Sequence, residues 1–157
     1  MFKKILASEK GFGLVHVLAA LIIVTVSVAG LFIASVVARS KAVENYHYRS
    51  ALLVASAKME LIRYHNRNLG NNYVNVNNII NLYDEVVIDE HNNNKVIVSI
   101  PSPYPLVDTY TDIQVSPNVM YDRVRLRVKW TEPQMLFMPM KTKYITLYED
   151  YFRRANL

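Results

Sequence analysis

The stretch that decides the fold reads FGLVHVLAALIIVTVSVAGLFIASVVA and extends from Phe12 to Ala38. Within it only His16 can carry a charge. At about 1.5 Å per residue, a helix of this length spans roughly 40 Å, more than the about 30 Å hydrocarbon core of a bilayer. The run is also longer than the about 7–15 apolar residues of a cleavable secretory signal. The sequence therefore predicts a membrane-spanning helix over residues 12–38.

The whole chain has the composition of a small folded protein. Its 157 residues are 52% hydrophobic and 20% charged, which excludes a disordered chain. That length suits a single domain. The sequence contains no cysteine. Disulfide scaffolds, thiol nucleophiles and cysteine-ligated zinc or iron–sulfur sites are therefore excluded.

A short basic segment precedes the apolar run. Residues 1–11 read MFKKILASEKG, and Gly11 is followed directly by Phe12 and the long apolar stretch. This junction resembles the signal of type IV prepilins. The resemblance implies that a prepilin peptidase cuts after Gly11 and methylates the new N-terminus at Phe12. It extends to about residue 65, and the positions that match the family pattern are Gly11, Phe12, Leu14, Val15, Val17, Leu18, Ala20 and Ile22.

One position departs from the family pattern. The fifth residue of the mature chain is almost always Glu in this family, where it is thought to pair with the N-terminus of a neighbouring subunit. Here it is His16, whose ring supplies no negative charge, although neutral imidazole accepts a hydrogen bond from an amine. Some minor pilins and pseudopilins at filament tips also lack this Glu. The resemblance thus implies a minor subunit, with Leu14, Val15 and His16 taking part in assembly; the alternative is a drifted position in a tolerant subunit.

After residue 38 the apolar pattern becomes amphipathic. Apolar residues recur at steps of three and four, which predicts that one helix continues over residues 12–65 and ends near Asn66. The stripe consists of Tyr48, Leu52, Ala55, Met59 and Ile62. Residues 66–81 are rich in Asn and predict a loop, with a short helix at 76–82 as an option.

Strands are predicted for the rest of the chain. Segments 85–89 and 95–100 flank an Asn-rich turn and indicate a hairpin. Residues 107–115 predict an irregular edge strand, and 119–130 alternate apolar and basic residues over the clearest strand, followed by a last strand over 141–151. A helix followed by an antiparallel sheet is an α+β arrangement. This layout is similar to that of pilins, in which one long N-terminal helix packs on a small antiparallel β-sheet.

The sequence shows no motif typical of catalysis or of metal binding. The four histidines show no ligand-like spacing, and we interpret them as scattered surface or interface residues. No nucleotide-binding or nucleophile motif is present, and residues 89–94 fail the pattern of a calcium loop. We therefore expect no enzyme, no catalytic residue, no metal, no cofactor and no small-molecule substrate.

The best candidate for a binding surface lies on the strand over 119–130. Period-two spacing places four basic side chains on one face, at about 7 Å intervals: Arg123, Arg125, Arg127 and Lys129. Such a stripe suits phosphates or acidic surfaces. The alternative is an ordinary solvated face whose charges are balanced by acidic residues on adjacent strands, drawn from Asp84, Glu85, Asp89, Glu90, Glu149 and Asp150.

These expectations combine into one organisation. Residues 1–11 form a prepilin leader, 12–38 the transmembrane and filament-core helix, and 39–157 a periplasmic or extracellular globular domain. Loss of the leader removes three Lys and one Glu, so the formal net charge falls from +5 to +3. The chain would sit in the inner membrane with its N-terminus in the cytoplasm before assembly, and in a periplasmic or cell-surface filament afterwards.

The expected function is structural. The resemblance implies a minor subunit of a type IV pilus or a type II secretion pseudopilus, with prepilin peptidase and other pilin subunits as partners. Two alternatives stay open. One is a pilus-associated binding module that holds DNA or a surface ligand through residues 123–129. The other is an uncleaved, single-span membrane-anchored protein.

Overall fold

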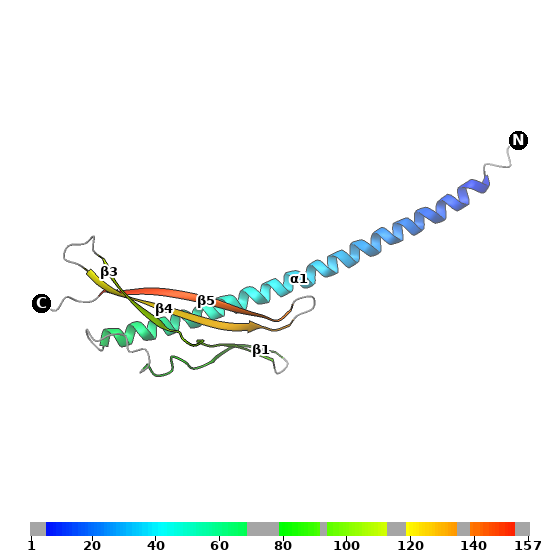
Figure 1. Cartoon of the computed structure of the whole chain (residues 1–157). Coiled ribbons are helices and arrows are strands. Elements are labelled where there is room, and N and C mark those ends of the chain that lie inside the picture. Colours follow the sequence, from blue (N-terminus) through cyan, green and yellow to red (C-terminus); the bar gives the residue numbers. More distant parts are fainter. Residues whose placement is uncertain (1–5, 69–78, 92–93, 113–118, 135–138, 153–157) are drawn as a thin grey trace. The chain divides into compact units, whose positions relative to one another are not determined.

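The computed structural model describes residues 6–68, 79–91, 94–112, 119–134 and 139–152 (Figure 1). Within them one helix is followed by strands only. The elements are α1 (Leu6–Asn68), β1 (Val86–His91), β2 (Asn94–Val98), β3 (Leu106–Asp112), β4 (Val119–Glu132) and β5 (Lys141–Phe152). The predicted α+β class is confirmed. Contacts divide the chain into two units, Met1–Ala42 and Val43–Leu157, which are described separately below.

Helix α1 is longer than predicted. It begins at Leu6 rather than at Phe12 and ends at Asn68 rather than near Asn66. The early start has a simple cause, because residues 6–10 read LASEK and are mostly good helix formers. At the other end, His65 and Arg67 lie in the last turn, where basic side chains interact favourably with the helix dipole.

The strands form two antiparallel sheets, and the expectation of a single sheet is wrong. One sheet pairs β1 with β2, and the other has the order β3-β4-β5. An isolated bridge links them, because Ser99 pairs with Lys129 through backbone hydrogen bonds of 3.0 and 2.8 Å. The sheets stay separate because regular strand pairing stops after Ile100. Here Pro101, Pro103 and Pro105 lack the N–H groups that a ladder of hydrogen bonds requires.

The predicted strand positions are confirmed to within a few residues. The hairpin β1-β2 carries an irregularity between Val87 and Asp89, and its turn at 92–93 lies outside the described residues. Strand β3 is regular rather than irregular, pairing with β4 from Leu106 to Asp112, while the expected extension to 115 falls outside the description. The optional helix at 76–82 also begins outside it, and the described residues 79–83 form a turn.

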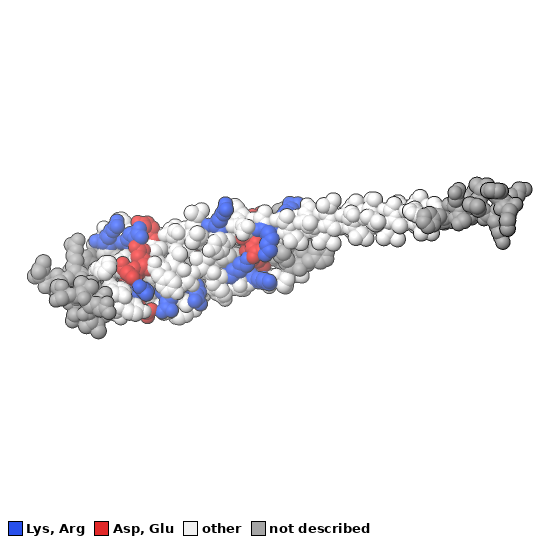
Figure 2. Space-filling view, turned by 90° about the horizontal axis from the view of Figure 1, so that it is seen from above, with Lys and Arg blue, Asp and Glu red and all other residues white. Residues whose placement is uncertain are grey.

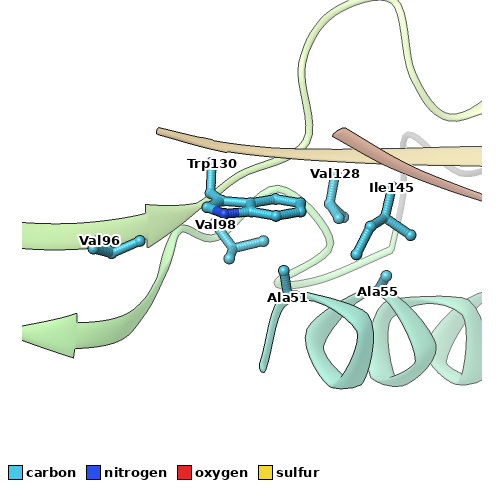
Figure 3. Packing of buried hydrophobic residues seen from close by; sticks show 7 residues of the cluster. All are labelled: Ala51, Ala55, Val96, Val98, Val128, Trp130 and Ile145. Atoms are coloured by element: carbon cyan, nitrogen blue, oxygen red, sulfur yellow. The ribbon is translucent and has the colours of Figure 1, made fainter. Parts of the chain in front are cut away.

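The core of unit Val43–Leu157 lies between α1 and the inner face of the sheets. One cluster combines Ala51, Ala55, Val96, Val98, Val128, Trp130 and Ile145 (Figure 3). A second combines Met59, Ile62, Ile79, Leu82, Val124 and Leu126. Strand β4 contributes residues to both clusters, because its apolar side chains alternate along one face and are fully or almost fully buried. The period-two pattern of β4 therefore places its basic residues on the opposite face.

The buried stripe of α1 is rotated from the predicted one. Ala55, Met59 and Ile62 are buried as expected, but Tyr48 is 48% exposed and Ala51 takes the buried place instead of Leu52. The cause is packing against Trp130, because the small side chain of Ala51 leaves room for the indole ring in the same cluster. Tyr48 contacts that indole only from the edge, with ring centroids 6.3 Å apart.

Lys58 does not belong to the predicted apolar stripe, yet it is only 7% exposed. Its Nζ donates a hydrogen bond to the carbonyl oxygen of Asn81. Asn81 adopts a φ of 64°, in the left-handed region that Asn tolerates better than most residues. The turn after α1 is thus held to the helix by a buried lysine.

Candidate functional site

Unit Met1–Ala42 offers an apolar helical surface. The described side chains from Gly13 to Ser35 are all exposed, with Leu14 at 66% and Val15 at 62%. Residues 13–35 include no Asp, Glu, Lys or Arg, and this part of the helix is white in Figure 2. Thr25 and Ser27 donate hydrogen bonds of 2.7 Å to the carbonyls of Leu21 and Ile23, as expected for hydroxyls on an apolar helix.

Such a surface requires a covering, because apolar area exposed to water is unfavourable. Within the described residues, one helix is long and apolar enough to cross a membrane, and its apolar stretch lies near the N-terminus. A candidate membrane span is therefore present, by length and composition. His16 lies on the exposed part of this helix, and Gly11 and Phe12 lie within α1.

The basic residues of β4 form the second candidate surface. Arg123, Arg125, Arg127 and Lys129 do share one face of the β3-β4-β5 sheet, opposite the core. Two of them are paired with carboxylates. Arg123 donates to both oxygens of Asp150 at 2.7 and 2.8 Å, and Arg125 donates to Asp108 at 2.5 Å.

At Arg123 and Arg125, these pairings agree with the predicted alternative of a sheet face whose charges are balanced by acidic residues on adjacent strands. Asp150 was among the acidic neighbours that we expected, whereas Asp108 on β3 was not. The hydrogen bond from Arg123 lowers the pKa of the Asp150 carboxyl, and the same contact raises the pKa of Arg123. The positive charge at residues 123 and 125 is therefore balanced locally. Figure 2 shows basic and acidic side chains beside one another rather than a continuous basic stripe on the face in view.

Arg127 and Lys129 differ from the other two basic residues. Arg127 donates to the hydroxyl of Thr146 at 3.1 Å, and its guanidinium carbon lies 4.6 Å from the centroid of Tyr104 and 5.8 Å from that of Tyr144. Among the described side chains, no carboxylate forms an ion pair with Arg127 or Lys129. Arg127 thus lies against aromatic rings, and Arg123 does so too, at 5.3 Å from the centroid of Tyr110 and 5.8 Å from that of Tyr121. The sequence did not predict these contacts.

Sequence reasoning also missed a buried polar cluster in unit Val43–Leu157. His47 is fully buried, so the interpretation of all histidines as surface or interface residues is wrong for it. Its Nδ1 lies 2.6 Å from Glu132 Oε2 and its Nε2 lies 2.9 Å from Asp89 Oδ2. Glu132 also accepts a 2.7 Å hydrogen bond from the indole Nε1 of Trp130. One signal was available, since His47 precedes Ala51 by four residues and continues the buried stripe of α1.

The electrostatics of this cluster favour a charged imidazole. Burial lowers the pKa of His47, but the hydrogen bonds and charges of Asp89 and Glu132 outweigh burial and raise the pKa above its usual 6.5. The carboxylates bind opposite ring nitrogens, so they do not converge on one point with the imidazole. Among the described residues, no group of three or more His, Asp or Glu side chains is placed to hold a metal ion. The cluster joins α1, β1 and β4 and has the features of a structural crosslink.

Further polar contacts join α1 to β5. Arg63 donates to Glu149 Oε1 from Nε at 2.7 Å and to Glu60 Oε2 from Nη1 at 2.6 Å, and Lys143 pairs with Glu44. Next to Glu149, burial and the neighbouring carboxylate raise the pKa of the Tyr151 hydroxyl.

Comparison of the chain with protein-family models, curated proteins and solved structures finds no match.

Proposed function

We propose that the chain is a structural minor subunit of a type IV pilus or a related pseudopilus. It would be made as a prepilin, cleaved after Gly11, methylated on Phe12 and assembled with other subunits. The proposal rests above all on one observation, the exposed apolar surface of α1 that begins directly after a prepilin-like junction. Leu14 and Val15 lie on that surface, where they are available to lipid or to neighbouring helices.

The inner membrane is the proposed location before assembly. Backbone groups have no water partners in a bilayer, and an uninterrupted helix satisfies them internally. The hydrogen bonds of Thr25 and Ser27 to the preceding turn satisfy their hydroxyls in the same way. In a filament, the same apolar surface would pack against the helices of other subunits, while residues 43–157 would face outward.

His16 supports a minor rather than a major role. A major subunit would use a carboxylate here to pair with the N-terminus of its neighbour, and a charged group without a partner is costly in an apolar surrounding. A subunit at the filament tip has no such neighbour above it, so the carboxylate is dispensable. The chain would then prime, cap or decorate the filament, and no catalytic step is proposed for it.

Processing tests the proposal most directly. The full chain would be produced in bacterial membranes with and without a prepilin peptidase, and its intact mass and N-terminal sequence measured in membrane and sheared-filament fractions. We expect a chain that starts at methylated Phe12 and occurs in the sheared fraction. A chain that still starts at Met1 and stays in the membrane would contradict the proposal and favour the uncleaved anchor.

Two glycines provide a matched pair of variants. Gly11→Val should block cleavage, because the peptidase would read the residue before the cut. Gly13→Val should be cleaved normally, because it leaves Gly11 in place; a Cβ at Gly13 also meets no atom of the chain within 4 Å, so the helix accommodates it. Equal cleavage of both variants would show that Gly11 is not the recognised residue.

The minor role has its own test. His16→Glu restores the usual carboxylate and should allow labelled subunits along the filament shaft, whereas His16→Gln should leave them at their original positions. Identical label distribution and filament number in all three proteins would remove the argument based on His16.

A further inference from the structure

One face of the β3-β4-β5 sheet is not covered by α1. We call it the outer face; it carries the odd-numbered residues of β4 from Tyr121 to Thr131. The opposite face contributes Val124, Leu126 and Val128 to the core. Because directly paired residues of antiparallel strands share a face, the register also assigns Tyr144, Thr146 and Tyr148 of β5 to the outer face. The whole surface lies in unit Val43–Leu157.

Aromatic rings are exposed along β5 on this outer face. Tyr144 is 55% exposed, Tyr148 61% and Phe152 72%. They recur at every fourth residue, which corresponds to about 14 Å along an extended strand. At one end Phe152 belongs to a row of rings, since its centroid lies 6.1 Å from that of Tyr121, and Tyr121 stacks on Tyr110 at 5.3 Å. These exposed rings offer flat apolar surfaces on which a second molecule can stack.

Positive charge lies among these rings. The guanidinium of Arg127 sits between Tyr104 and Tyr144, at 4.6 and 5.8 Å from their centroids. Lys129 is exposed and pairs with Tyr144 in the register, so the two side chains leave the same face of the sheet from neighbouring strands. Asp108 and Asp150 balance Arg125 and Arg123, whereas none of the described carboxylates forms an ion pair with Arg127 or Lys129, so the net positive charge of this face lies at their end.

We propose that this outer face binds single-stranded nucleic acid, with bases stacked on Tyr144 and Tyr148 and phosphates held by Arg127 and Lys129. Flat aromatic platforms combined with cations are the recurring chemistry of such sites, because every base has a π-face and every nucleotide a phosphate. A duplex hides its base faces, so the rings favour unpaired strands. An acidic polysaccharide would use the cations without the rings, and a neutral glycan would use the rings without the cations.

The test measures binding to the full chain in detergent. The probe is a fluorescein-labelled oligothymidylate of about 16 nucleotides, followed by anisotropy and compared with a duplex of the same length. We expect tighter binding of the single strand and weaker binding as salt increases. Absence of binding, or equal affinity for the duplex, would overturn the proposal.

Variants separate stacking from charge. Tyr148→Ala should weaken binding by roughly fivefold to a hundredfold, the usual effect of removing one stacked ring. Lys129→Ala should reduce the slope of log affinity against log salt by about 0.7, the value for one phosphate contact on a single strand. Affinity and slope that stay unchanged in both variants would overturn the proposal.

Matched controls lie on α1 rather than on the sheet. Tyr64→Ala removes a ring that is 62% exposed, and Arg49→Ala removes an exposed cation. Both should keep the original affinity, and losses as large as those of the sheet variants would refute a localised site. All four substituted positions are at the surface, so we expect each variant to fold. An unchanged emission spectrum of the buried Trp130 checks this for each variant. The result does not depend on processing at Gly11, so this inference and the proposed function can fail separately.

Discussion

His47 on α1 lies 2.6 Å, from Nδ1 to Oε2, from Glu132 at the end of β4, although 85 positions separate the two residues in sequence. The second ring nitrogen reaches Asp89 on β1 at 2.9 Å, so one buried side chain joins three elements. Groups of this kind are expensive to leave unpaired, because a buried polar atom without a partner has lost its contacts with water.

Replacement of His47 should destabilise the fold. His47→Gln keeps a polar group but cannot carry the positive charge that faces both carboxylates. We expect a loss of unfolding free energy on the order of 1–3 kcal/mol, measured by chemical denaturation in detergent. His65→Gln, at a half-buried position in the last turn of the same helix, is the control and should change stability far less. A similar loss in both variants would mean that the cluster adds nothing specific.

Stability should depend on pH through His47. Its pKa is raised in the folded state, so the folded protein binds the proton more tightly than the unfolded chain. The stabilisation is therefore fully present below about 6.5, the ordinary pKa of the unfolded chain, and is lost as pH rises through the higher folded value. The difference in unfolding free energy between wild type and His47→Gln, measured from pH 6 upward, should shrink. A difference that grows with pH would contradict the assigned direction.

Trp130 offers a direct optical readout, since it is the only tryptophan in the sequence. Its side chain is 1% exposed and donates to Glu132 at 2.7 Å. We expect emission at short wavelength and weak quenching by acrylamide in the folded chain, with a shift to longer wavelength on unfolding. Strong quenching under native conditions would show that the cluster in Figure 3 is not formed.

Two leucines test the assignment of the core. Leu126 is fully buried on β4, whereas Leu53 is 72% exposed on α1. Leu126→Ala should cost about 2–5 kcal/mol, because it removes buried methyl groups and leaves a cavity. Leu53→Ala makes the same chemical change at the surface and should alter the unfolding free energy by less than about 0.5 kcal/mol. Comparable losses would show that the buried face of the sheet is assigned wrongly.

Local patterns in the sequence predicted the elements well. The apolar run from residue 12 to 38 predicted the exposed apolar part of α1, and alternation of apolar and basic residues predicted β4. Both signals depend on neighbours a few residues apart, because helix and strand periods are short. The prepilin-like junction at Gly11 and Phe12 is also a local feature, and its functional meaning stays a prediction.

The tertiary structure alone decided which distant groups meet. Asp89 and Glu132 lie 42 and 85 positions from His47, and no local period relates them. In the same way, the basic face of β4 was predictable, but the partners of its side chains were not. The ion pairs of Arg123 and Arg125 and the ring contacts of Arg123 and Arg127 depend on which residues the rest of the chain brings beside β4. Periodicity determines which way a side chain points along its own element, whereas packing between elements determines which partner it finds there.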